Sequence, residues 1–169
     1  RANDANMSEQ TTTKAIYGGK TDKQDRQQAF TNGQIPVAVY GLGKMGLPLA
    51  AVYSDVTGNV IGADIDPEVV ASINRGECHV DREPGLDDLV AELVREEELE
   101  AVDEPTKAAS SANIHVVIVP TLIDELNRPD LSIIKAVTED IGSELDPGDF
   151  VIIESTVPPQ TCREIVLPI

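Results

Sequence analysis

Three glycines stand at a fixed spacing in residues 41–46, which read GLGKMG and match the pattern G-x-G-x-x-G. An apolar run comes directly before this segment and a helical pattern directly after it. In this setting Gly41 permits a tight turn, Gly43 lets the backbone approach a pyrophosphate, and Gly46 lets the helix pack close to the strand. Free amide groups at the helix N-terminus then face the phosphates. The segment therefore predicts a dinucleotide-binding loop, and a glycine-rich turn without a ligand is the alternative.

A carboxylate follows this loop at the distance that ribose recognition requires. Asp64 lies 18 residues after Gly46, near the end of the apolar run Val60–Ile65. A carboxylate there accepts hydrogen bonds from both hydroxyls of the adenosine ribose and repels a 2′-phosphate, which favours NAD over NADP. Asp66 is a competing candidate, but its position just before Pro67 is typical of a helix N-cap.

The apolar pattern around these residues predicts a doubly wound α/β fold of the Rossmann type. Strands are expected over Ile35–Tyr40, Val60–Ile65, Ile114–Val119 and Phe150–Glu154, with a weaker one over Leu99–Val102. Helices are expected over residues 44–56, 67–75, 86–98 and 131–145, the last opened by Asp130. Strands that alternate with helices imply right-handed crossovers and a parallel sheet covered on both faces.

The chain divides at residue 34. Residues 1–34 are polar, lack a sustained apolar period and carry a net charge of +1. We expect them to form a flexible arm, with a short helix over Asp22–Phe30 and with Met7 as the natural start. Residues 35–169 form one NAD-binding domain, which we expect to be incomplete at its C-terminal end.

The charge balance limits the classes of partner. The formal net charge is −17, and residues 35–169 alone carry −18. Such a charge opposes binding to nucleic acid and to anionic membranes. It fits a cytoplasmic protein of an extreme halophile, where salt screens the repulsion, and an ordinary acidic protein is the alternative. No transmembrane span or signal segment is apparent, and the two cysteines indicate a reducing cytoplasm rather than a disulfide framework.

From Val37 onward the sequence resembles the UDP-glucose/GDP-mannose dehydrogenase family, the nucleotide-sugar 6-dehydrogenases. The resemblance rests on VAVYGLGKMGLPLA (37–50), GADIDPEVV (62–70), INRGECHV (73–80), EPGL (83–86), VIVPT (117–121), PDLS (129–132) and ESTVPPQT (154–161). The EPGL, VPT and STVP segments are far more specific than the glycine loop. VPT together with Glu154-Ser155-Thr156 is more similar to the UDP-N-acetylhexosamine and UDP-N-acetylmannosamine dehydrogenase branches than to the UDP-glucose branch.

The resemblance implies a reaction and a set of cofactor residues. Such enzymes use two NAD molecules to take the C6 alcohol of a UDP-sugar through an aldehyde and a cysteine-bound thioester to the uronate. Carried over by position, Thr121 and Thr156 flank the nicotinamide, and Thr156 also helps to hold an active-site water. A helix N-cap before Pro158 is the other interpretation of Thr156. The cofactor-binding residues are thus Gly41, Leu42, Gly43, Lys44, Met45, Gly46, Asp64, Thr121 and Thr156.

Two positions depart from the family pattern, and its catalytic segment is missing. Val69 stands where the family commonly has a lysine that contacts the adenosine end, and Lys44 replaces a frequent tyrosine. The nucleophilic cysteine of a G-G-x-C-x-P-K-D-like segment is absent from the sequence. We therefore expect this chain to bind NAD without turnover, and the family's dimer to need the missing C-terminal half.

The remaining reactive side chains have plainer interpretations. Cys78 and Cys162 lack a neighbouring base and are interpreted as structural thiols without zinc spacing. His115 alternates within an apolar strand, which indicates a packed core residue. Glu154, at a strand end near the predicted cofactor, is either a general base or a hydrogen-bonding group.

Two other functions stay open. One is a 3-hydroxyisobutyrate-like β-hydroxyacid dehydrogenase, whose glycine loop often reads GLGxMG. The other is a non-enzymatic, nucleotide-sensing Rossmann module. The EPGL helix argues against the first, and the end of the chain one helix short of a finished sheet argues against the second.

Overall fold

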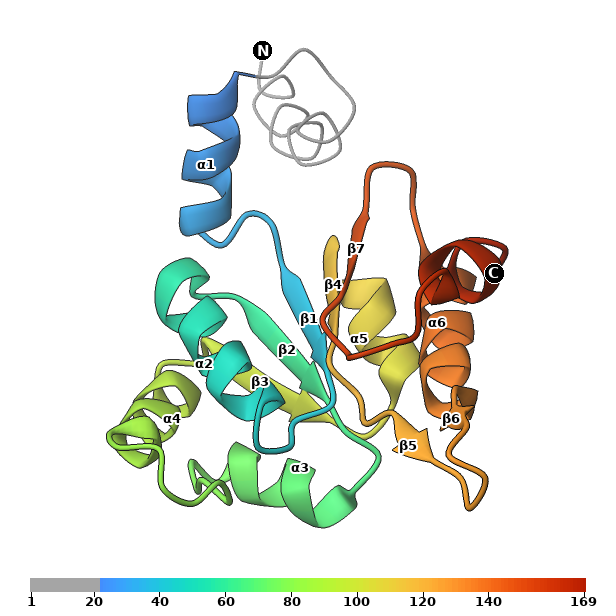
Figure 1. Ribbon diagram of the computed structural model, residues 1–169. Coiled ribbons are helices and arrows are strands. Elements are labelled where there is room, and N and C mark those ends of the chain that lie inside the picture. Colours follow the sequence, from blue (N-terminus) through green and yellow to red (C-terminus); the bar gives the residue numbers. More distant parts are fainter. Residues whose placement is uncertain (1–21) are drawn as a thin grey trace.

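The centre of the protein is a five-stranded parallel sheet, seen in a computed structural model that describes residues 22–169 (Figure 1). The strand order is β3-β2-β1-β4-β7, and every neighbouring pair is parallel. The strands are β1 (Val37–Tyr40), β2 (Val60–Ala63), β3 (Leu99–Val102), β4 (Ile114–Val117) and β7 (Phe150–Ile153). The predicted α/β class is therefore confirmed, and the weak third strand is present.

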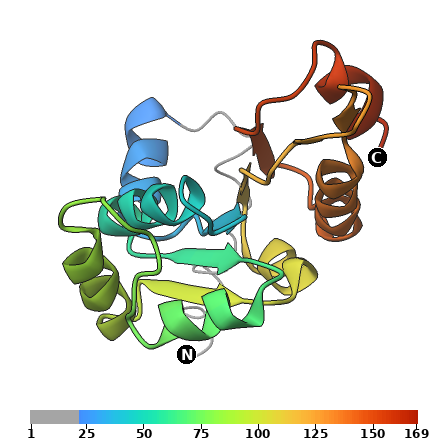
Figure 2. The same ribbon diagram turned by 60° about the horizontal axis from the view of Figure 1, so that its bottom comes forward.

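Helices cover both faces of this sheet, as the sequence predicts. The helices are α1 (Lys23–Thr31), α2 (Gly46–Thr57), α3 (Pro67–Asn74), α4 (Leu86–Arg95), α5 (Pro105–Ser111) and α6 (Ser132–Glu144). One apolar cluster joins the sheet to α2, α3 and α4, and a second joins its other face to α5 and α6. In Figure 2, α4 and α6 lie at opposite ends of the molecule. Within residues 22–169, none of the helices is long and apolar enough to cross a membrane.

The two central strands explain why the sequence shows continuous apolar runs rather than alternation. All four residues of β1 and all four of β4 are buried. Val37 and Val39 belong to the cluster on one face, whereas Ala38 and Tyr40 belong to the cluster on the other. A strand covered on both faces is apolar at nearly every position, which is typical of parallel sheets, and His115 of β4 is the polar exception.

Helix ends differ from the expected bounds for local reasons. The second helix begins at Gly46 instead of Lys44, because the preceding residues form the glycine loop. Helix α4 ends at Arg95 instead of residue 98, because Glu97 adopts a left-handed conformation with φ +61°. The amide of Glu98 then donates to the carbonyl oxygen of Leu93 and closes the helix end. The turn after α4 carries no glycine, so the sequence lacks the usual stop signal there.

Two small elements escape the sequence patterns. Helix α5 has seven residues and begins at Pro105, a favoured first helical residue. A two-stranded hairpin joins β5 (Leu122–Ile123) to β6 (Pro129–Asp130). Both are too short to show an apolar period.

The first 21 residues, including Met7, lie outside the described part of the chain. The short helix expected over residues 22–30 is present as α1, and the Asp22 side chain caps it by accepting from the amide of Gln24. Ala29 of this helix is buried in the cluster that contains α2. The C-terminal part of the segment before residue 35 therefore contacts the domain. For the residues before α1, the flexible arm stays a prediction.

Three polar side chains, Tyr40, His115 and Asp149, form a row inside the protein. His115, on β4, is 1% exposed, which confirms it as a core residue. Its Nδ1 lies 3.0 Å from the hydroxyl oxygen of Tyr40, and its Nε2 lies 4.0 Å from Oδ2 of Asp149. Burial lowers the pKa of His115 against a smaller opposing effect of Asp149, and burial raises the pKa of Tyr40. At neutral pH the imidazole is therefore uncharged, and its Nδ1 shares a hydrogen bond with the Tyr40 hydroxyl.

This row predicts a pH-dependent stability. Because the pKa of His115 is lowered by folding, the unfolded chain binds more protons below about pH 6.5. Neutral His115 makes its full contribution to the unfolding free energy above that pH. As the pH falls from there through the lowered pKa, this contribution is lost by up to about 1.4 kcal/mol per pH unit. We expect His115→Gln to flatten this slope in urea unfolding between about pH 5.5 and 7.5. Exposed His79 is the control, since His79→Gln should keep the wild-type slope; equal slopes for wild type and His115→Gln would refute a neutral buried His115.

Candidate dinucleotide site

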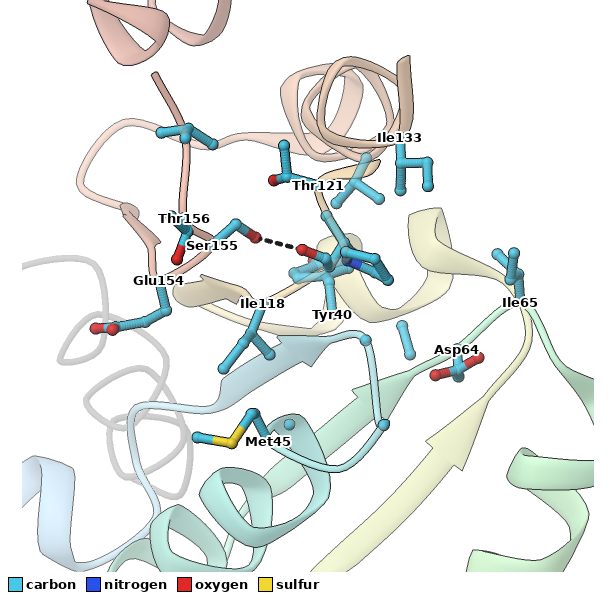
Figure 3. A pocket seen from close by; sticks show the side chains of 18 of the residues that line it. Tyr40, Met45, Asp64, Ile65, Ile118, Thr121, Ile133, Glu154, Ser155 and Thr156 are labelled. Carbon is cyan, nitrogen blue, oxygen red and sulfur yellow. Dashed lines mark hydrogen bonds between the residues drawn. The ribbon is translucent and has the colours of Figure 1, made fainter. Parts of the chain in front are cut away.

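A cavity of about 1030 Å³ lies at the carboxyl ends of the strands, where ligands bind in open parallel sheets (Figure 3). The structure brings together nearly all of the residues that the sequence predicted for the site. The predicted residues in its lining are Gly41, Gly43, Lys44, Met45, Gly46, Asp64, Thr121 and Thr156. They come from four different strand ends, so that residues more than 100 positions apart in the sequence share one cavity.

The three glycines meet three different steric demands. Gly41 has φ +93°, and a Cβ there would lie 2.8 Å from the carbonyl oxygen of Ile118. A Cβ on Gly46 would collide with the carbonyl oxygen of Gly41 and lie 3.0 Å from Cγ2 of Ile118. At Gly43 a Cβ would meet nothing within 4 Å. The first and last glycine are thus needed for folding of the turn, whereas Gly43 leaves open space on the cavity side.

Leu42 differs from the other predicted cofactor residues, because its side chain turns away from the cavity into the core. It is fully buried, and it packs on Gly62 of β2. A Cβ on Gly62 would lie 2.7 Å from both methyl carbons of Leu42. The sequence pattern showed that position 42 belongs to the loop but not that its side chain holds the loop down.

Asp64 follows β2 directly and faces the loop. Its Oδ2 accepts the amide of Leu42 at 2.7 Å, and its Oδ1 accepts the amide of Asp66 at 3.0 Å. Asp66 instead caps α3, because its Oδ1 accepts the amide of Glu68 at 2.9 Å. The cap role predicted for Asp66 is confirmed, and Asp64 is the carboxylate in the cavity lining.

The other end of the cavity lies after β4 and β7. Thr121, Glu154, Ser155 and Thr156 are grouped there, opposite Asp64 in Figure 3. Ser155, which the sequence analysis did not single out, donates from its hydroxyl to the carbonyl oxygen of Val119 at 2.8 Å. This bond ties the segment after β7 to the segment after β4. The sequence shows that VPT and ESTVP each follow a strand, but it does not show which groups of the two segments form a hydrogen bond.

Of the alternatives raised for this end, the helix-cap interpretation of Thr156 can be judged from the geometry. Thr156 does not cap a helix: the next helical segment is a π-helical turn over Cys162–Val166, preceded by Thr161. Glu154 is exposed, and its carboxylate points away from Thr121 (Figure 3). Its chemical role stays a prediction.

Apolar side chains form much of the remaining lining. Ile65, directly after Asp64, is 82% exposed, and Ile123 of the β5–β6 hairpin is 69% exposed. Ile133 and Val137 of α6 also line the cavity. A cavity with apolar walls and a few placed polar groups is typical of cofactor sites. Sequence reasoning missed this wall because its residues come from the short hairpin, from the segment after β2 and from α6, which are far apart in the sequence.

The residues with plainer interpretations lie outside this cavity. Both cysteines are free, and burial is the main cause that raises the pKa of the Cys78 thiol, which makes it a poor nucleophile. Cys162 is exposed on the π-helical turn. Val69, where the family commonly has lysine, packs against the core from α3.

Comparisons with known proteins give the family. Residues 35–169 match the model of the NAD binding domain of the UDP-glucose/GDP-mannose dehydrogenase family. An NDP-N-acetyl-D-galactosaminuronic acid dehydrogenase from Ralstonia nicotianae is 40% identical over 122 residues, which are 72% of this chain and 28% of that protein. A UDP-N-acetyl-D-mannosamine dehydrogenase from Campylobacter jejuni is 38% identical over 130 residues, 76% of this chain and 31% of that protein.

Solved structures agree. The structure of UDP-D-ManNAc dehydrogenase from Pyrococcus horikoshii is similar with a TM-score of 0.72 and 33% identity, over 78% of this chain and 31% of that one. A ternary complex of GDP-mannose dehydrogenase from Pseudomonas aeruginosa gives a TM-score of 0.74 and 27% identity, over 79% and 31% of the two chains. This chain therefore spans about three tenths of the length of the relatives it matches.

The glycine geometry predicts opposite outcomes for two equal substitutions. Gly46→Ala places a methyl group against the Gly41 carbonyl, which cannot move without opening the turn. We expect the unfolding free energy, measured by urea denaturation, to fall by about 2–3 kcal/mol. Gly43→Ala is the matched control, because its methyl group enters open space, and its stability should stay within about 0.5 kcal/mol of wild type. Equal stability of both variants would contradict the close contact.

Proposed function

We propose an NAD site in this cavity, because the chain belongs to the UDP-glucose/GDP-mannose dehydrogenase family and spans its NAD-binding domain. The observation that carries the proposal is that a glycine, a helix N-terminus and a carboxylate come together at the loop. Gly43 has no Cβ and faces open space, α2 begins three residues later, and Asp64 stands across from both. Pyrophosphate needs close backbone approach and the positive end of a helix, and ribose needs a carboxylate.

The donor and acceptor set fits each part of the cofactor. Each oxygen of Asp64 accepts one backbone amide and, as a carboxylate oxygen, keeps a second acceptor site for a ribose hydroxyl. The loop backbone would hold the pyrophosphate, with Lys44 and Met45 beside it. Thr121 and Thr156, at the far end of the cavity, would flank the nicotinamide. When bound there, NAD supplies a hydride acceptor, and the apolar wall would exclude water from it.

For the complete protein we propose oxidation of the C6 alcohol of a UDP-sugar to the uronate with two NAD molecules. The relatives support an N-acetylhexosamine as the sugar, since their names describe N-acetylmannosamine and N-acetylgalactosaminuronic acid dehydrogenases. They agree with the branch predicted from VPT and EST. They do not favour the β-hydroxyacid dehydrogenase or the nucleotide sensor. A water-positioning role for Thr156, the homodimer and the cytoplasmic location are parts of the same proposal.

Calorimetric titration tests the cofactor site directly. We expect the chain to bind NAD at least about tenfold more tightly than NADP, because the Asp64 charge repels a 2′-phosphate. Gly43→Ala should weaken NAD binding at least about tenfold, since its methyl group occupies the space a pyrophosphate needs. Val52→Ala, an exposed change on α2, is the control and should bind as wild type does.

The same preparation tests the absence of turnover. We expect no NADH, followed by its absorbance, from UDP-N-acetylmannosamine or other UDP-sugars, because the sequence lacks the G-G-x-C segment. NADH formation by this chain alone would overturn that part of the proposal. A wild-type chain that fails to bind NAD would overturn the cofactor site.

A further inference from the structure

We propose that Asp64 is also a positioning residue: its carboxylate ties the glycine loop to the end of β2 and so sets the loop shape that receives the pyrophosphate. The inference rests on the proposed NAD site. It assigns to Asp64 a second role that is independent of ribose contact. The ribose role alone requires a carboxylate near the adenosine end; it does not require that carboxylate to hold the loop.

The tether consists of two short hydrogen bonds on opposite oxygens. Oδ2 accepts the amide of Leu42 at 2.7 Å, across 22 residues of sequence, and Oδ1 accepts the amide of Asp66 at 3.0 Å. The backbone amide of Asp64 itself donates to the carbonyl oxygen of Val102 on β3. The backbone of Asp64 is thus fixed to β3, and its carboxylate is fixed to the turn before α3 and to the loop. Backbone amides that bind an ionised carboxylate form strong hydrogen bonds.

Leu42 is the point where the tether acts on the loop. Its side chain is fully buried on Gly62, one strand away, so residue 42 is held at its side chain by packing and at its amide by Asp64. Holding Leu42 inward turns the next residue, Gly43, toward open space. Without the carboxylate, the Leu42 amide loses its acceptor in a half-buried turn, and the loop gains other conformations. A rigid loop binds its ligand without the entropy cost of ordering it.

A ligand without ribose hydroxyls separates the two roles. The probe is 2′,3′-dideoxy-ADP, which keeps the diphosphate and lacks both hydroxyls, and ADP is its reference. If Asp64 served the ribose alone, Asp64→Asn would leave binding of dideoxy-ADP unchanged, or would tighten it by removing a negative charge near phosphates. If Asp64 also tethers the loop, Asp64→Asn weakens dideoxy-ADP about tenfold, which is the usual loss for one hydrogen bond to a charged group.

Asp66→Asn is the matched control. It removes the same charge from the same turn, and asparagine caps a helix as well as aspartate does. It leaves the backbone amide that Asp64 accepts in place. We expect dideoxy-ADP to bind to this variant as tightly as to wild type, or slightly more tightly. Equal affinities of the wild type and the Asp64→Asn variant for dideoxy-ADP would overturn the inference, as would equal weakening by both substitutions.

A measurement on the wild-type chain covers the case in which Asp64→Asn does not fold. Amide hydrogen exchange of Leu42 without ligand should be slow, because the amide is bonded to the carboxylate at 2.7 Å. Where the variant folds, this amide should exchange at least about tenfold faster, with the β1 amides unchanged. Exchange of Leu42 at the rate of an unstructured amide in wild type would refute the tether. A wild-type chain that fails to bind NAD refutes the proposed function instead, and the exchange result still decides the tether.

Discussion

The close approach of α2 to the glycine loop is the contact on which the site depends. The first residue of α2, Gly46, stands so near the carbonyl group of Gly41 that no side chain fits between them. This approach lets the chain leave β1, turn within a few residues and begin a helix directly over the strand it has left. The free amides of the helix therefore point at the end of the sheet rather than into solvent. A wider turn would move those amides away from the carboxyl ends of the strands.

The order of the strands places the other half of the site opposite this turn. From β1 the chain continues outward through β2 and β3, and it then returns to add β4 and β7 on the other side of β1. The connections therefore diverge between β1 and β4: helices α2, α3 and α4 cover one face, whereas α5 and α6 cover the other. A crevice must open where neighbouring strands send their chains to opposite faces. The loop, Asp64 and the two threonines meet there because each directly follows a strand of this sheet or lies close beyond its end.

Sequence patterns predicted the parts of this arrangement that depend on local spacing. The glycine triplet, the acid after β2 and the continuous apolar strands each follow from demands within one βαβ unit, and the residues that meet them are recognisable by type. What escaped prediction arises between units. The inward direction of Leu42 depends on Gly62 of the neighbouring strand, and the bond from Ser155 depends on a carbonyl 36 residues away. The apolar wall comes from a hairpin with two-residue strands, too short for any period to appear.

An acidic chain faces a particular difficulty when its ligand carries phosphates. With a net charge of −17, long-range attraction cannot bring a pyrophosphate to this surface. Within the described residues, the lining of the cavity includes one basic side chain, Lys44. Backbone amides solve the difficulty locally, because they present partial positive charge at contact distance and add no net charge to the protein. Such binding depends on the direction of a few amide groups rather than on the number of cations. The shape of the loop must then be held firmly, which is what the glycine contacts, the buried Leu42 and the carboxylate of Asp64 together provide.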